Sequence, residues 1–249
     1  MSILSHNIIM GSSAGGGGGD NTNASGTQHT ISSTDVVHST DQQKIGATSM
    51  KWPANGDYLA IADHADWDFG TGDFTWEMWV YSAWRGDANM KLWGSSQWGT
   101  QTQDYIFDVN PLDYGGSTLR IQFHGGGGSP EYSTSTALAS NTWTHAAGVR
   151  ESGHVRTYID GVQRLSVATA LNASLANVGT PYLGWKPANT GDGFVGYMDE
   201  VRISTSCRYP SGTTFTPSTE KFADDTDTVL LIHSDTTNGD TTFSDASGQ

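Results

Sequence analysis

Residues 74–81 constrain the fold of this chain more than any other segment. A two-residue period places Phe74, Trp76, Met78 and Val80 on one face, and the residues between them on the other. This pattern predicts a β-strand, because successive side chains of an extended chain point to opposite faces. At about 3.3 Å per residue, such a strand is long enough to cross a whole β-sandwich.

Short strand-like runs recur along the rest of the chain, and no window combines a helical period with helix caps. Asn55-Gly56 and Asp160-Gly161 predict tight hairpin turns, because both pairs tolerate positive φ values. The other expected strands are residues 48–52, 58–62, 90–93, 104–109, 118–124, 142–150, 155–159, 162–167, 182–185, 193–204 and 228–233. Many strands without helices predict one all-β domain, an antiparallel two-sheet β-sandwich.

Composition agrees with short strands joined by turns and argues against several classes of partner. The chain has 21 Asp but 5 Glu, and Asp favours turns whereas Glu favours helices. A net charge of −14 repels phosphate backbones, so we expect no nucleic-acid partner. Apolar runs fall short of the about 18 residues of a membrane span, so we expect no membrane partner. The single cysteine, Cys207, allows no intrachain disulfide and is typical of folding in a reducing cytosol.

Changes in composition divide the chain into three parts. Residues 1–34 contain the glycine run Gly11–Gly19 and are expected to form an N-terminal arm and linker. This arm is either a disordered tail or a segment that orders against a neighbouring subunit. Residues 35–234 carry the strand pattern and are expected to form the sandwich. Residues 235–249 are expected to form a polar C-terminal tail.

Several segments together resemble the laminin-G-like, or concanavalin A-like, family, in the variety common in phage and bacterial surface proteins. They are residues 57–61, 66–81, 143–150, 155–162, 194–204, 208–209 and 214–217. Taken in order, these segments span most of residues 35–234. The resemblance implies a concanavalin A-like jelly roll, but a fold of this kind does not by itself determine function.

The chain resembles virion proteins in four respects. It has a glycine-rich arm and a polar tail, and it lacks a signal peptide and disulfides. We therefore expect a non-enzymatic phage structural protein, either a capsid decoration protein or a tail or fibre component, made in the host cytoplasm. Residues 1–34 are expected to bind other virion proteins, and the chain is expected to form a homo-oligomer. The alternative is a carbohydrate-binding adhesin or receptor-binding module. A glycoside hydrolase or lyase is disfavoured, because Glu77 stands alone on its strand and the adjacent Asp199 and Glu200 should face opposite ways.

Two sets of residues are candidates for binding. Four aromatic residues in or near loops could stack on sugars or anchor an interface, or could instead pack inside the protein: Trp84, Trp93, Trp98 and Tyr105. Five aspartates are candidate calcium ligands, with turn capping as the alternative: Asp63, Asp66, Asp68, Asp192 and Asp199. The resemblance implies calcium, since many family members carry a structural calcium ion. The eight histidines are dispersed along the sequence, so no zinc site is expected.

Overall fold

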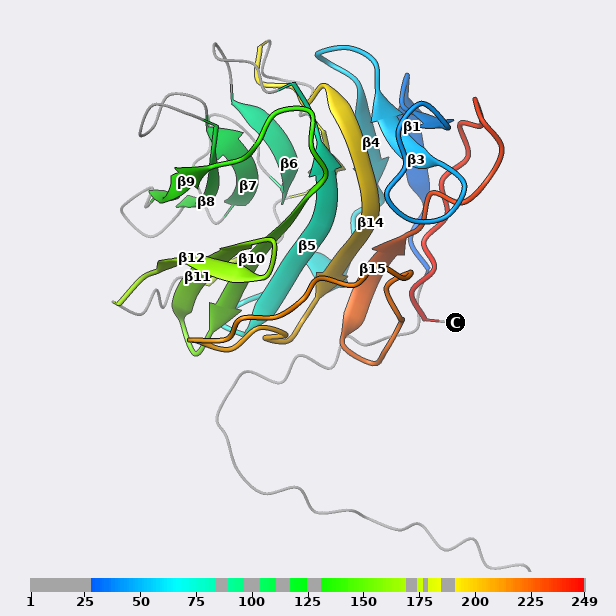
Figure 1. Cartoon of the computed structure of the whole chain (residues 1–249). Helices are drawn as coiled ribbons and strands as arrows, with labels where there is room; N and C mark the ends of the chain where they lie inside the picture. Colours follow the sequence, from blue (N-terminus) through cyan, green and yellow to red (C-terminus); the bar gives the residue numbers. More distant parts are fainter. Residues whose placement is uncertain are drawn as a thin grey trace, which may run out of the picture.

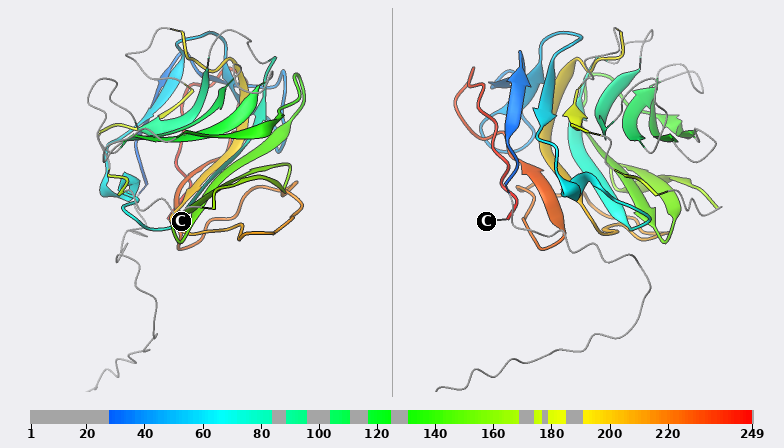
Figure 2. Two further views of the ribbon diagram at one scale, coloured as in Figure 1. Left: turned by 90° about the vertical axis from the view of Figure 1, so that its left-hand side faces the viewer. Right: turned by 180° about the vertical axis from the view of Figure 1, so that it is seen from behind.

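The protein is a two-layer β-sandwich (Figures 1 and 2). The computed structural model describes residues 28–83, 89–95, 104–110, 117–124, 131–168, 174–176, 179–184 and 191–248. The seven-stranded sheet has the order β1 (Ile31–Thr34), β4 (Tyr58–Ile61), β13 (Tyr182–Leu183), β6 (Met90–Ser95), β7 (Asp104–Asn110), β8 (Thr118–His124), β9 (Glu131–Ala137).

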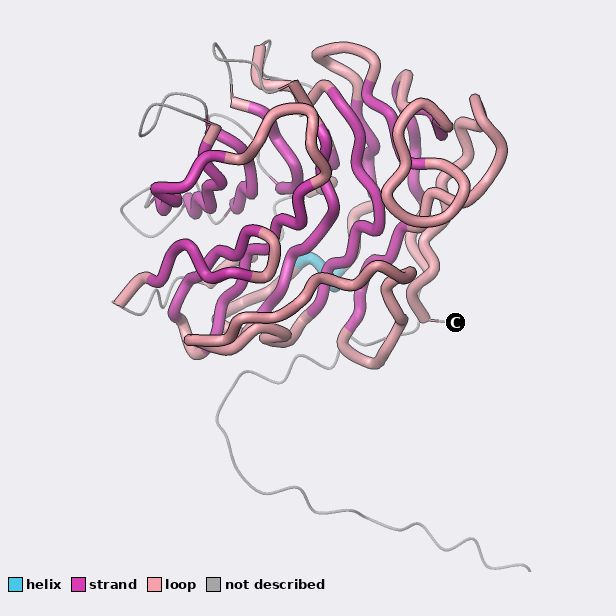
Figure 3. Tube along the Cα trace, in the orientation of Figure 1, coloured by secondary structure: helices cyan, strands magenta, loops and turns pink. Residues whose placement is uncertain are grey.

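The second layer is an eight-stranded sheet, with every pair antiparallel. Its order is β12 (Val162–Ser166), β11 (His154–Ile159), β10 (Thr144–Glu151), β5 (Phe74–Tyr81), β14 (Gly196–Ser204), β3 (Ser49–Trp52), β2 (Val37–Ser39), and β15 (Thr228–Ile232) pairs with β14. One short 3-10 helix, η1 (Ala65–Trp67), follows β4 (Figure 3). The predicted all-β sandwich is therefore confirmed.

The main core lies between the sheets and is built from the alternating residues of the strands. On β5 the residues Phe74, Trp76, Met78 and Val80 are fully buried in this core, as the two-residue period predicts. The rings of Phe74 and Trp76 stack with centroids 4.0 Å apart. Because the other face of β5 also carries large side chains, a second layer of packing forms on the outside of the eight-stranded sheet.

The two predicted tight turns have different outcomes. Asp160 and Gly161 have φ values of 49° and 74° and connect the paired strands β11 and β12, so this hairpin is confirmed. Asn55 and Gly56 also form a turn, but the strands on either side, β3 and β4, belong to different sheets. The expected hairpin is therefore wrong, and this turn is the point where the chain crosses from one layer to the other.

The structure also moves the boundaries of the sandwich outward. Residues 31–34, assigned to the arm, form β1 and pair with β4 along its whole length. Residues 235–248, assigned to a polar tail, lie along β1 and β2 (Figure 2): His38 exchanges backbone hydrogen bonds with this segment, and Thr30 bridges to Ser244. Phe243 is 6 % exposed and belongs to the main core. Both segments are thus part of the folded body.

Candidate functional site

The outer face of the eight-stranded sheet changes character along β5. Near its start, Thr75 donates a hydrogen bond to the carbonyl of Ser206 at 2.7 Å. This contact lies beneath the segment 205–227, which crosses the sheet in Figure 1. Further along, Trp79 is covered by the ammonium of Lys44, 3.9 Å from its ring centroid. Only the last outer residue of β5, Tyr81, is half exposed. Most of this face is therefore closed by the chain itself.

Glu77 is fully buried beneath this cover and has three side-chain hydrogen-bond partners. Its carboxylate accepts hydrogen bonds from the Tyr209 hydroxyl at 2.6 Å and from Arg202 Nε at 2.8 Å, and lies 3.1 Å from His145 Nε2. Burial alone would raise the pKa of Glu77, but the hydrogen bond and charge of His145, with those of Arg202 and Tyr209, outweigh it and hold the pKa at about 2. This glutamate is a structural anchor for the covering segment.

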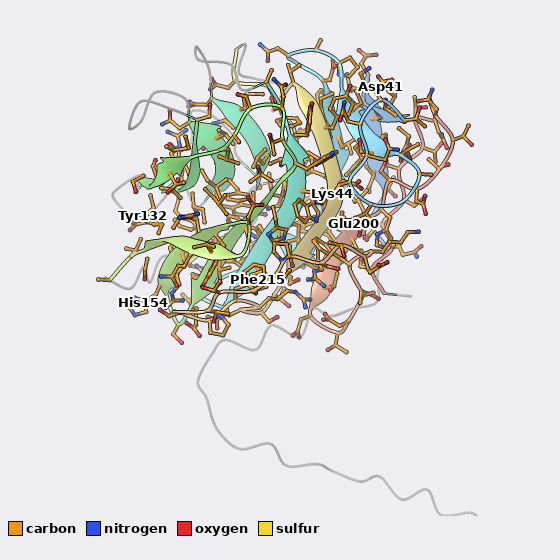
Figure 4. All side chains as sticks on the ribbon, in the orientation of Figure 1. Asp41, Lys44, Tyr132, His154, Glu200 and Phe215 are labelled. Carbon is orange, nitrogen blue, oxygen red and sulfur yellow. The ribbon has the colours of Figure 1, made fainter. Side chains whose placement is uncertain are left out.

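Asp199 and Glu200 are not on opposite faces, because a β-bulge interrupts β14 between Asp199 and Arg202. Glu200 takes a φ of 50° at this bulge, and its carboxylate accepts a hydrogen bond from the backbone of Phe222 at 2.7 Å. The Asp199 carboxylate accepts from the backbone N–H groups of Lys44 and Ile45 at 3.0 Å. Figure 4 shows Lys44, Glu200 and Phe215 on one side of the sheet.

These acids are used to hold the cover in place. Glu77, Asp199 and Glu200 are each at most 1 % exposed, and backbone amides or cations occupy their carboxylates. Burial, helped by the charge of Glu200, raises the pKa of Asp199 to about 7 despite its backbone hydrogen bonds. The bulge also brings Arg202 opposite Glu77, and the Arg202 guanidinium forms an ion pair with Glu77.

Beyond the covered region, three half-exposed aromatic side chains form a row that starts just before β10 and crosses β5 and β14. We call this row the aromatic strip: Trp143, Tyr81 and Tyr197. The ring centroid of Tyr81 lies 5.6 Å from Trp143 and 5.8 Å from Tyr197. The register places Tyr81 opposite Tyr197, and Tyr197 opposite Lys51 on β3. Strand pairing therefore fixes Tyr81 and Tyr197, whereas Trp143 lies in the segment just before β10.

The rings of the aromatic strip are not coplanar. Tyr81 meets Tyr197 at 78° and Trp143 at 53°, so the strip is a tilted, uneven surface. Its end is charged: the Lys51 ammonium lies 5.8 Å from the Tyr197 ring centroid and 2.6 Å from Asp41 Oδ2. The strip thus combines apolar ring faces with hydrogen-bonding groups, a combination suited to a ligand that has both.

The outer face of the seven-stranded sheet carries charge instead. Asp108 alternates with core residues on β7 and is fully buried between Lys91 Nζ at 2.7 Å and a two-pronged contact from Arg120. Burial would raise the pKa of Asp108, but the charges of Lys91 and Arg120 lower it. On the same face Tyr58 and Tyr182 are half exposed, with ring centroids 5.6 Å apart.

The aromatic residues predicted as a sugar platform are not confirmed as one. Trp93 and Tyr105 are fully buried in the main core, where Tyr105 stacks on Trp76 at 5.1 Å. Both fall on the inward face of their strands, so the prediction is wrong for these two. Trp84 and Trp98 lie outside the described residues. The signal for the aromatic strip was the outward face of residues 74–81, which already contained Tyr81.

The predicted calcium ligands are divided between different places. Asp199 is committed to backbone N–H groups and lies in the eight-stranded sheet, so it does not join the others. Asp192 lies between β13 and β14. Asp63 and Asp68 are exposed beside η1, whereas Asp66 is buried and faces two imidazoles.

In the described part of the chain, no helix has the length and apolar character needed to cross a membrane.

Comparison with known structures identifies similar sandwiches. One is a protein of Bacteroides ovatus, 16 % identical, with a TM-score of 0.52, covering 89 % of this chain and 56 % of that one. Another is domain 4 of an extracellular arabinanase from Geobacillus stearothermophilus in complex with arabinotriose, 17 % identical, with a TM-score of 0.51, covering 72 % and 82 %. A third is tailspike protein 2 of an Escherichia coli O157:H7 bacteriophage, 16 % identical, with a TM-score of 0.56, covering 72 % and 26 %.

These likenesses establish the fold alone, and this chain spans little more than half of the Bacteroides ovatus protein. No curated protein matches the sequence at a significant level. The family model Laminin_G_3, described as the concanavalin A-like lectin/glucanases superfamily, matches residues 53–211. This match covers more than half of the sequence, and the chain therefore belongs to the concanavalin A-like lectin/glucanases superfamily.

Proposed function

We propose that this domain is a non-catalytic module that binds a carbohydrate chain across the aromatic strip of Trp143, Tyr81 and Tyr197. The observation that carries the proposal is the contrast along β5. Its other outward side chains are covered by the protein's own segments, whereas Tyr81 and its two aromatic neighbours are half exposed. Exposed aromatic rings held in a row by a rigid sheet are suited to stack against sugar rings.

The shape of the strip favours a single flexible chain over a flat polymer surface. Because the rings meet at 53° and 78°, they cannot all contact one plane. A chain that twists can contact each ring in turn, and the Lys51–Asp41 pair then offers a donor and an acceptor to its hydroxyl groups. Binding by a similar fold is represented by the arabinanase domain in complex with arabinotriose.

The absence of catalysis is part of the proposal. Retaining glycosidases need two carboxyl groups about 5–5.5 Å apart that both reach the substrate. Glu77, Asp199 and Glu200 are buried, and each is already bound by groups of the protein. The aromatic strip itself ends at Asp41, whose carboxylate is paired with Lys51.

A glycan array followed by titration of the best ligand tests this proposal. Tyr81→Ala and Tyr197→Ala should each weaken binding about tenfold or more, the loss expected when about 1.4 kcal/mol of contact is removed. Tyr58→Ala is the matched control, since Tyr58 is a half-exposed tyrosine on the other sheet. Circular dichroism should confirm that each variant folds.

The proposal fails if no glycan binds the wild-type protein at millimolar concentration. It also fails if Tyr58→Ala abolishes binding while Tyr81→Ala and Tyr197→Ala retain it, which would assign the ligand to the outer face of the seven-stranded sheet.

Attachment to a phage particle through residues 1–34 is a second proposal. Its support is that residues 31–34 form an edge strand of the sheet, so the segment before them leaves from a fixed point. The tailspike has a similar fold, but at 16 % sequence identity this similarity does not assign the role of the tailspike to this chain. Residues 1–27 should be cleaved by protease in the isolated protein and protected in assembled particles. Equal cleavage in both states would refute this role.

A further inference from the structure

One end of the β1–β4 edge of the seven-stranded sheet brings two histidines and an aspartate together. His29 precedes β1, and His64 and Asp66 lie at η1, just after β4. Antiparallel pairing joins these distant parts of the sequence: Ile31 lies opposite Ile61, and the Ala62 N–H donates to the Thr30 carbonyl at 2.9 Å. Asp66 Oδ2 is then 3.1 Å from His29 Nε2 and 3.2 Å from His64 Nδ1.

His29 is the unusual member of this cluster. Its side chain is 2 % exposed, and its Nε2 has no partner in hydrogen-bond geometry, although Asp66 Oδ2 is only 3.1 Å away. A buried polar nitrogen without a hydrogen bond is costly. The ring is nevertheless held firmly: it contacts the Trp67 ring at 4.3 Å, and the His29 backbone N–H donates to Asp245 at 2.9 Å. Its nitrogen is thus fixed in position and directed into the cluster.

The spacing of the three side chains matches that of ligands around one metal ion. In a tetrahedral site with bonds of about 2.0–2.1 Å, neighbouring ligand atoms lie about 3.3 Å apart. The two nitrogen–oxygen distances of 3.1 and 3.2 Å are close to this value. All three ligand atoms lie within 4.8 Å of one another. His64 Nδ1 also accepts a hydrogen bond from the Asp66 backbone N–H at 3.3 Å, so a rotation of the half-exposed His64 that releases this bond would complete the arrangement.

We propose that His29, His64 and Asp66 bind one divalent first-row transition metal ion, for which Zn²⁺ is the first probe. The donor set selects this class, because imidazole nitrogens suit zinc and its neighbours, whereas calcium takes six to eight oxygen ligands. Calcium at Asp63, Asp66 and Asp68 remains the competing expectation from the sequence, and it would leave the two imidazoles without a role. The exposed carboxylates of Asp63 and Asp68 in the same loop add negative charge that favours any cation.

The role of this metal is to fasten the start of the folded body. It would bind the segment around His29, which follows residues 1–27, to the loop that carries His64 and Asp66. Three protein ligands leave a fourth position for water or for a group from a partner. The cluster lies at the seven-stranded sheet, so this inference does not depend on carbohydrate binding at the aromatic strip.

Calorimetric titration of Zn²⁺ into the full-length, untagged protein after chelator treatment, at a neutral pH, is the direct test. We expect one equivalent to bind and the melting temperature to rise in its presence. His64→Ala should remove this equivalent and the shift, and should fold normally because its side chain is half exposed. His154→Gln is the matched control: His154 is half buried, pairs with the Val167 carbonyl, and should leave binding unchanged.

Co²⁺ titration provides a second readout, since intense visible bands report tetrahedral coordination. Asp66→Asn should abolish these bands; if that variant does not fold, His64→Ala decides alone. The proposal is overturned if the wild-type protein binds no Zn²⁺, or if His64→Ala retains the full equivalent. It is equally overturned if Ca²⁺ binds and shifts melting while Zn²⁺ does not.

Discussion

Asp199 should make the protein less stable as the pH rises from about 5 to about 8. Its pKa is about 7 in the folded chain, against an ordinary value of 3.8. Within this window the folded state therefore holds a proton that the unfolded state has lost. Stability is then present at low pH and is lost as the pH rises through 7. Between pH 5 and the folded pKa of about 7 lie about two pH units. The free energy of unfolding should therefore fall by about 3 kcal/mol over this range.

The substitution Asp199→Asn removes this titration and keeps an oxygen that can accept from Lys44 and Ile45. The variant should therefore not lose stability as the pH rises from 5 to 8. Its free energy of unfolding, relative to wild type, should increase by about 3 kcal/mol between pH 5 and pH 8. Urea unfolding of both proteins at both pH values measures this change. Comparing the variant with wild type at each pH cancels the titration of all other groups.

Asp235→Asn is the matched control. Asp235 accepts from the Ala47 N–H at 2.8 Å, in the same loop that Asp199 holds, but Lys221 lowers its pKa. Because this pKa lies below its ordinary value of 3.8, Asp235 is ionised in the folded chain at both pH values, so Asp235→Asn should shift stability equally at both. An equal pH dependence in wild type and Asp199→Asn would show that burial does not raise the pKa of Asp199, and would refute this reasoning.

Three further substitutions test the packing, each by urea unfolding. Gly161→Ala should lower the free energy of unfolding by about 2 kcal/mol or more, since Gly161 has a φ of 74° and a Cβ there would overlap the Phe215 carbonyl oxygen. Tyr209→Phe should cost about 1–2 kcal/mol, because the buried carboxylate of Glu77 loses a donor. Phe243→Ala should cost about 3 kcal/mol, as expected for a buried ring.

Each of these three substitutions has either a control variant or a result that would contradict the prediction. Gly56→Ala should cost less than Gly161→Ala, because Gly56 also has a positive φ but open space around a Cβ. Costs below about 0.5 kcal/mol for Phe243→Ala would mean that residues 235–248 behave as the tail expected from the sequence. For Tyr209→Phe, unchanged stability would show that Glu77 is satisfied without this hydroxyl.

The strands that could be predicted from sequence are those with an apolar face. Residues 74–81, 104–109 and 118–124 alternate clearly and form β5, β7 and β8. The strands β1, β2 and β9 were missed because their sequences, ISST, VHS and EYSTSTA, are mostly polar and give no alternation to detect. They are edge or near-edge strands, where hydrogen bonding to a neighbour is enough without a buried face.

The candidate sites were harder to predict, because they depend on pairing between distant strands. Tyr81 and Tyr197 are far apart in sequence and become neighbours only through the β5–β14 register. The same is true of His29 and His64, which the β1–β4 pairing brings together. The bulge at Glu200 reverses an inference that strict alternation would require. A local pattern can place Tyr81 on the outward face of its strand, but it cannot show which distant residues become neighbours or where a bulge interrupts the alternation.

The closing of the eight-stranded sheet links the fold to the proposed function. An open outer face would expose Glu77 and Asp199, the groups from which a hydrolytic site would be built. Segment 205–227 and the loop around Lys44 instead take up these carboxylates as hydrogen-bond acceptors, and the acids become part of the framework. The part of this face left open carries the rings of Trp143, Tyr81 and Tyr197, which contribute contact area and two phenol hydroxyls but no pair of carboxyl groups. The segments that stabilise the sandwich therefore also take up the acids of this face, which supports the proposed binding role.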